Sequence, residues 1–169
     1  MTQRQNIGLI VWYYLGWFGC VYFGRWGISN WSLIFPMMPM VYLLKSKTIS
    51  IAQFLFLVKI SMVGIIFDSA AYYFQWITFP NHQASVIPTW LVSMWLLFAT
   101  IFPLSHRLFK TKLGLAAVLG AIFGPLSYYS GVAFESISFG HRNVLFIYAI
   151  FWGIYFPIVH YFYRKTYEH

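Results

Sequence analysis

Charged side chains are scarce in this sequence. Its 169 residues include eleven Lys and Arg and three Asp and Glu, so that charged residues make up 8% of the chain. A soluble domain is about one-quarter charged residues, and this composition therefore excludes an ordinary soluble fold. Intrinsic disorder is excluded as well, because 60% of the residues are hydrophobic. The composition is that of a membrane protein.

Cysteine and metal-binding patterns are also scarce. The single cysteine, Cys20, excludes a disulfide framework or a CxxC redox pair within the chain. The five histidines form no HxxxH or HxxHH pattern, so we predict no metal site and no cofactor. The net charge of +8 does not indicate nucleic acid, because the basic residues are scattered singly and in pairs instead of clustering on one segment.

Long uncharged runs are what the sequence does have. A bilayer core about 30 Å thick requires about 20 apolar residues per helix. Six stretches approach that length, and they predict a single polytopic domain over residues 1–169: an all-α membrane protein built as a six-helix transmembrane bundle. The expected helices cover about 7–24, 30–44, 50–76, 89–105, 113–134 and 143–163. The segment FPNHQASVIP, between the third and the fourth, is expected to be an exposed loop.

The basic residues predict the orientation, because cationic loops stay on the cytoplasmic side. With six crossings, most Lys and Arg residues fall on the side that holds both termini, whereas Arg25 and Arg142 are the cations expected outside. We therefore expect a multi-pass protein whose N- and C-termini are both cytoplasmic. The lipid bilayer is its first predicted partner.

Two charges lie within the third apolar stretch. A Lys or Asp at the centre of a bilayer costs about 2.5–3.5 kcal/mol on insertion scales and generally faces a partner or a wet cavity. The long side chain of Lys59 can extend to the headgroups, but the short side chain of Asp68 cannot. Asp68 is therefore the charge that requires an explanation.

Helical spacing places Ser61, Asp68 and Tyr72 on one polar face. One interpretation of this face is a ligand pocket that opens to the external side. The other is a buried ion pair, in which Arg25 or Arg142 would neutralise Asp68. Glu135 either forms a carboxylate pair with Asp68 or meets Arg142 or His141 in the loop.

The fifth apolar stretch carries a packing signal. Gly120 and Gly124 have the GxxxG spacing that lets another helix approach closely, and this face could receive a second membrane protein. Pro125 interrupts the helix, either as a kink or as part of a binding site. Trp17, Trp95 and Trp152 lie near the middle of their helices, where they either fill the core or line a pocket.

Four segments resemble a family of bacterial membrane proteins catalogued as domain of unknown function 2878: LGWFGC, GIIFDSAAYY, IPTWLVSMWLLFATIFPLSHRL and VLGAIFGPLSYYSG. The resemblance covers nearly the whole chain. It implies a location in the inner (cytoplasmic) membrane, and it implies that the residues shared with the family pattern are Asp68, Trp90, Trp95, Ser105, Pro125 and Tyr128. It supplies no activity.

The sequence thus favours a protein that binds or transports a lipophilic or small-molecule ligand. The expected ligand-binding residues are Asp68, Ser61, Tyr72, Trp90, Trp95 and Tyr128. Two alternatives stay open. One is an intramembrane lipid-modifying enzyme that uses Asp68 as acid or base. The other is an assembly subunit that docks a membrane protein through the fifth helix.

Overall fold

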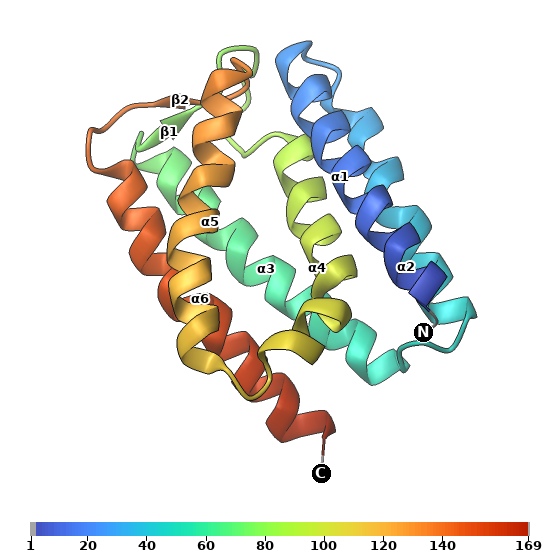
Figure 1. Cartoon of the computed structure of the whole chain (residues 1–169). Helices are drawn as coiled ribbons and strands as arrows, with labels where there is room; N and C mark the ends of the chain where they lie inside the picture. Colours follow the sequence, from blue (N-terminus) through green and yellow to red (C-terminus); the bar gives the residue numbers. More distant parts are fainter. Residues whose placement is uncertain (1–2, 169) are drawn as a thin grey trace.

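The computed structural model describes residues 3–168, which form six α-helices and one short β-ladder (Figure 1). The prediction of an all-helical fold is confirmed. In chain order, the elements are α1 (Gln3–Arg25), the 3₁₀ helix η1 (Ser29–Leu33), α2 (Ile34–Lys45), α3 (Ile51–Tyr73), β1 (Ile77–Thr78), α4 (Thr89–Phe109), α5 (Leu113–Ala133), β2 (Ser138–Phe139) and α6 (Val144–Tyr167).

Five of the described helices are long and apolar enough to cross a membrane: α1, α3, α4, α5 and α6. The sixth, α2, has 12 residues and rises about 18 Å. The five residues of η1 lead directly into it and add about 10 Å. Together they approach the thickness of a bilayer core of about 30 Å. The expected helix over 30–44 is therefore a 3₁₀ segment followed by a short α-helix.

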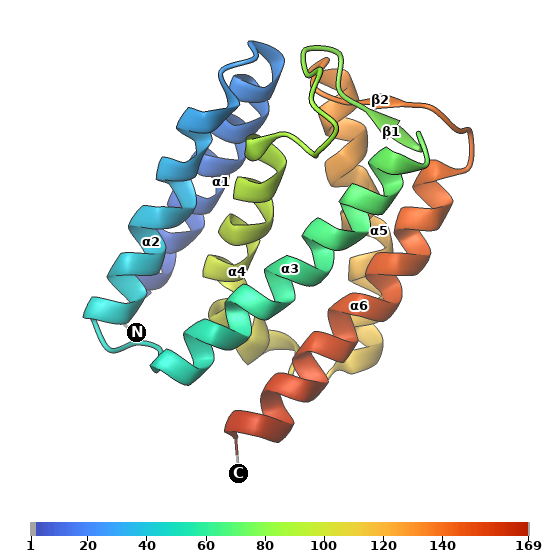
Figure 2. The same cartoon turned by 180° about the vertical axis from the view of Figure 1, so that it is seen from behind.

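The helices form two groups joined by α3. Helices α1, α2 and α4 pack together, while α5 packs chiefly against α6. Helix α3 contacts α4 and α6, and Figure 2 shows it crossing obliquely in front of α4 and α5. A capping box starts α3: the Ser50 side chain accepts from the Gln53 backbone N–H, and the Gln53 side chain accepts from that of Ser50.

A two-stranded antiparallel ladder ties the α3–α4 connection to the α5–α6 connection, with Ile77 opposite Phe139. The expectation of an exposed loop over residues 79–88 was partly wrong. Phe79 and Ile87 are buried, because the connection folds back over the helix ends, whereas Asn81 and the segment 83–86 are exposed.

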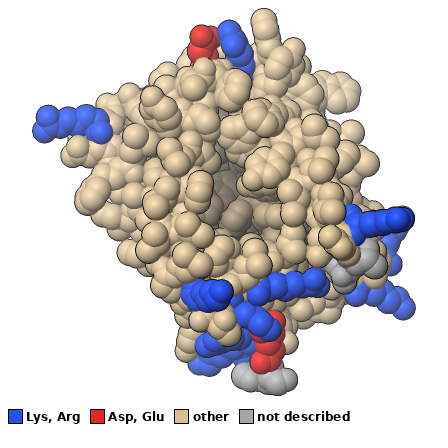
Figure 3. All heavy atoms as spheres, in the orientation of Figure 1, with Lys and Arg blue, Asp and Glu red and all other residues tan. Residues whose placement is uncertain are grey.

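Both ends of the chain lie at the same end of the molecule (Figure 1). Lys and Arg side chains gather at that end, and a smaller group with one acidic side chain lies at the opposite end (Figure 3). Lys59 lies in the first half of α3 and is exposed, as its long side chain allows.

Candidate functional site

Asp68 lies in the middle of the bundle and is completely buried. Its carboxylate accepts hydrogen bonds from three side chains on three other helices: from Trp95 Nε1 at 2.6 Å, from Tyr128 Oη at 2.8 Å and from Tyr148 Oη at 2.7 Å. Four helices, α3 to α6, therefore meet at this carboxylate. Three neutral donors satisfy the oxygen atoms that water would otherwise solvate.

The ion pairs differ from those that we expected. Among residues 3–168, no Lys or Arg pairs with Asp68; instead, Arg25 pairs with Glu135 at 3.0 Å on the exposed rim of the molecule. Arg142 is exposed and forms no salt bridge with a described residue. The predicted ion pair of Asp68 with either arginine is thus wrong. Hydroxyl and indole groups of the neighbouring helices donate to its carboxylate instead.

The polar face of α3 is used for packing. Ser61 is buried and donates to the backbone oxygens of Leu57 and Trp95, both at 3.0 Å. The hydroxyl of Tyr72 donates to Ala84 O at 2.9 Å and so holds the α3–α4 connection. These two side chains lie outside the cavity described next, and the expected pocket along this face is not where the hollow of the molecule lies.

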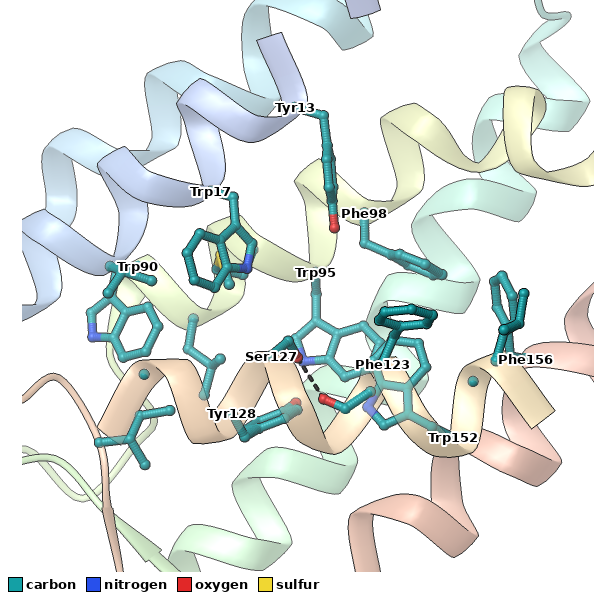
Figure 4. Close-up of a pocket in the computed structure, with 18 of the residues that line it drawn as sticks. Tyr13, Trp17, Trp90, Trp95, Phe98, Phe123, Ser127, Tyr128, Trp152 and Phe156 are labelled. Atoms are coloured by element: carbon teal, nitrogen blue, oxygen red, sulfur yellow. Dashed lines mark hydrogen bonds between the residues drawn. The ribbon is translucent and has the colours of Figure 1, made fainter. Parts of the chain in front are cut away.

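A cavity of about 390 Å³ lies between α4 and α5. It forms a hollow about halfway between the two ends of the molecule, on the face that shows α1, α4 and α5 (Figure 3). Residues of α1, α4, α5 and α6 line it, and their rings surround it (Figure 4). The expected binding residues Trp90, Trp95 and Tyr128 line this cavity, and so do Trp17 and Trp152.

Each of three buried tryptophans lies against a glycine of a neighbouring helix: Trp90 against Gly24, Trp95 against Gly64 and Trp152 against Gly124. A Cβ atom on any of these glycines would collide with the ring. Trp95 and Trp152 stack in parallel, with ring centroids 5.0 Å apart. The glycines therefore make room for the large rings that form the cavity wall.

The small-residue face of α5 is covered by α6 of the same chain. A Cβ atom on Gly120 would lie 2.6 Å from the backbone oxygen of Trp152, and one on Gly124 would overlap the Trp152 ring. Pro125 is buried one position further along α5, which continues through it to Ala133. The GxxxG signal therefore belongs to packing within the chain.

Asp68 is connected to the cavity through its wall. Trp95 and Tyr128 line the cavity while their N–H and O–H groups point to Asp68 behind it. Ser127, also in the wall, donates to Gly124 O at 2.6 Å. The indole N–H of Trp152 is buried and has no hydrogen-bond partner among the described residues. Asp68 thus positions two wall residues without itself lining the cavity.

Sequence reasoning missed a buried pair of histidines. His106 of α4 and His160 of α6 face each other with their Nδ1 atoms 3.0 Å apart, and Glu168 Oε1 lies 3.5 Å from His106 Nε2. One Nδ1 must carry a hydrogen for this bond, and Glu168 favours a hydrogen on His106 Nε2, so we assign the Nδ1–H to His160. Spacing gave no signal, since the two residues are 54 positions apart. Within residues 3–168, no three His, Cys, Asp or Glu side chains gather as a metal site.

Five described helices that are long and apolar enough to cross a membrane indicate a helical membrane protein. A family model matches residues 6–158, and the chain belongs to that family, DUF2878, described as a protein of unknown function. The resemblance found in the sequence motifs is therefore confirmed. No curated protein and no solved structure matches the chain.

Proposed function

We propose that this protein binds a lipophilic molecule in the cavity between α4 and α5. The observation that carries the proposal is the position of the hollow, which is about halfway along the helices on their outer face (Figure 3). In a bilayer, this face would meet acyl chains, so a ligand would enter sideways from the membrane. This direction differs from the externally open pocket that we expected from the sequence.

The size and lining of the cavity support the proposal. Ligand sites typically have volumes of about 300–1,000 Å³ and mostly apolar walls with few polar groups. The volume of about 390 Å³ falls within this range, and the lining residues include no charged side chain among those described. Phe123 lines the cavity and is 63% exposed, so it belongs to the wall and to the lipid-facing surface.

The alternatives have less support. An acid–base enzyme would need a carboxylate within reach of its substrate, whereas Asp68 lies behind Trp95 and Tyr128 and already accepts three hydrogen bonds. An assembly subunit that docks through the glycines of α5 would have to displace α6.

The same proposal includes six membrane crossings, with both termini on the cytoplasmic side of the bacterial inner membrane. It is supported by the combined rise of η1 and α2, by the position of both chain ends at one end of the molecule, and by the basic side chains that gather there (Figures 1 and 3).

Native mass spectrometry of the protein purified from its own membrane tests the binding proposal. We expect a co-purified lipophilic molecule that is lost from the Leu119→Trp variant, because Leu119 lines the cavity and a larger ring would fill it. The matched control is Val118→Trp, since Val118 is 55% exposed and lies outside the lining. Equal retention by both variants, or no bound molecule in the parent protein, contradicts the proposal.

A further inference from the structure

Aromatic rings dominate the wall of the cavity. Ten of its nineteen lining residues are Phe, Tyr or Trp, although these residue types make up 23% of the chain. The rings come from α1, α4, α5 and α6, so that they surround the cavity instead of covering one side of it (Figure 4). A pocket for saturated acyl chains needs only apolar area, which Leu, Ile and Val supply equally well. This wall offers ring faces and edges in addition.

Three polar side chains of the wall bond within the protein, whereas the buried indole N–H of Trp152 has no partner among the described residues. Trp95 and Tyr128 donate to Asp68, and Ser127 donates to a backbone oxygen. Asp68 therefore has a second effect besides joining four helices: it keeps two hydrogen-bond donors turned out of the cavity. A ligand in the cavity therefore contacts the rings of Trp95 and Tyr128 and not their hydrogen-bond donors.

Aromatic rings attract other π-systems by their quadrupoles, in edge-to-face or offset contacts worth about 0.5–1.5 kcal/mol beyond the buried area for a pair of rings. A chain with several double bonds brings π-electrons to the ring edges along its length, whereas a saturated chain offers only C–H groups and apolar area. The cavity volume of about 390 Å³ lies near the lower end of the range for ligand sites, about 300–1,000 Å³. This space suits a short chain better than a complete phospholipid.

We infer that the ligand is a short neutral chain with several double bonds, held by the ring faces of the cavity between α4 and α5. The inference rests on the proposed function and specifies its ligand class. The lack of charge follows from the lining, which holds no charged residue in the described chain.

The experiment compares farnesol with its fully hydrogenated counterpart, which has the same carbon skeleton and hydroxyl group but no double bond. The two compete at equal concentration for the purified full-length protein, and native mass spectrometry distinguishes the bound forms by mass. We expect farnesol to occupy about fivefold more protein. We expect Leu119→Trp to lose both ligands and Val118→Trp to retain both.

A second pair of variants tests the rings themselves. Phe123→Leu removes a ring from the wall at a position that is 63% exposed. It should bring the ratio of bound farnesol to bound saturated alcohol closer to one. Phe146→Leu is the matched control, because Phe146 is 69% exposed on α6 and outside the lining, and its ratio should equal that of the parent protein.

Equal occupancy by the two alcohols in the parent protein, with both lost in Leu119→Trp, overturns the inferred preference for double bonds while the lateral binding site stands. Binding of neither alcohol also overturns it, and the co-purified molecule then decides the proposed function separately. A Phe123→Leu ratio that matches the parent protein contradicts the expected contribution of the Phe123 ring to the preference.

Discussion

Asp68 is completely buried and joins four helices through side-chain hydrogen bonds. Each of its three donors comes from a different helix, and two of them form the cavity wall. A carboxylate can accept all three because it has two oxygens and no hydrogen of its own. Its role is therefore that of a positioning residue for Trp95 and Tyr128.

Asp68→Asn should destabilise the protein by about 1–3 kcal/mol, since the amide NH₂ group would face donors and leave one of them unpaired. Thermal unfolding in detergent measures the change. Ser69→Ala is the neighbouring control: Ser69 is exposed and bonds only within its own helix, to Ile65 O, so its stability should change by no more than about 0.5 kcal/mol. Equal effects of the two substitutions would contradict this account of Asp68.

Gly124→Ala should destabilise the protein by about 1–3 kcal/mol, because its Cβ would overlap the Trp152 ring. Gly114→Ala on the same helix is the control. A Cβ there meets no atom within 4 Å, and replacing a helical glycine by alanine normally stabilises by about 0.5–1 kcal/mol. We expect the two changes in unfolding free energy to have opposite signs. The same sign would show that the Trp152 ring does not pack against Gly124.

Side chains of α4 and α6 contact each other at the basic end of the molecule. His106 and His160 share a hydrogen bond and lie against Phe102, and Glu168 beyond them pairs with Lys110 at 3.1 Å. His160 Nε2 has no hydrogen-bond partner among the described residues, and His106 Nε2 has only Glu168 Oε1 near it, at 3.5 Å. The pair therefore fixes how the two helices approach, at the cost of incompletely satisfied nitrogen atoms.

A double-mutant cycle measures this contact. His106→Phe or His160→Phe alone leaves one buried Nδ1 without its partner and should cost about 1–3 kcal/mol of unfolding free energy. The double variant removes both polar groups and retains ring packing. Its loss of unfolding free energy should therefore be smaller than the sum of the losses of the two single variants. Strict additivity would mean that the two rings do not interact.

Helix positions followed from the sequence much better than the contacts between helices. Helix α5 begins at Leu113 and ends at Ala133, and the expected range was 113–134. The agreement is close because the length of a membrane-spanning apolar run is set by the thickness of the bilayer. Asp68 could be singled out since it is a carboxylate in an apolar helix. Tyr148 could not, because one tyrosine among thirteen carries no sign of which helix it faces.

The direction of the cavity was also beyond the sequence. The polar face of α3 suggested an opening to the external side, but Ser61 and Tyr72 donate to backbone oxygens instead. The hollow arises where α4 and α5, neighbours in the chain, pack mainly against other helices. Trp90, Trp95 and Tyr128 were predicted to line a pocket, and they do line the cavity. The position of the cavity could not be predicted, because it depends on how the helices pack.

The whole molecule has a basic end and a nearly uncharged middle. A reporter fused in the loop after Lys45 should be active in the cytoplasm, and one fused at His82 should be active outside, because these loops lie at opposite ends of α3. Enzymatic reporters that work on only one side of the membrane measure this. The same side for both fusions would exclude a transmembrane α3.

The lateral cavity is the central claim, and an experimental structure of the protein prepared with its native membrane lipids tests it most directly. We expect elongated density between α4 and α5, bounded by Trp95, Phe123 and Trp152. A structure in which the side chains of α4 and α5 close the space completely, with no density between them, would contradict the claim.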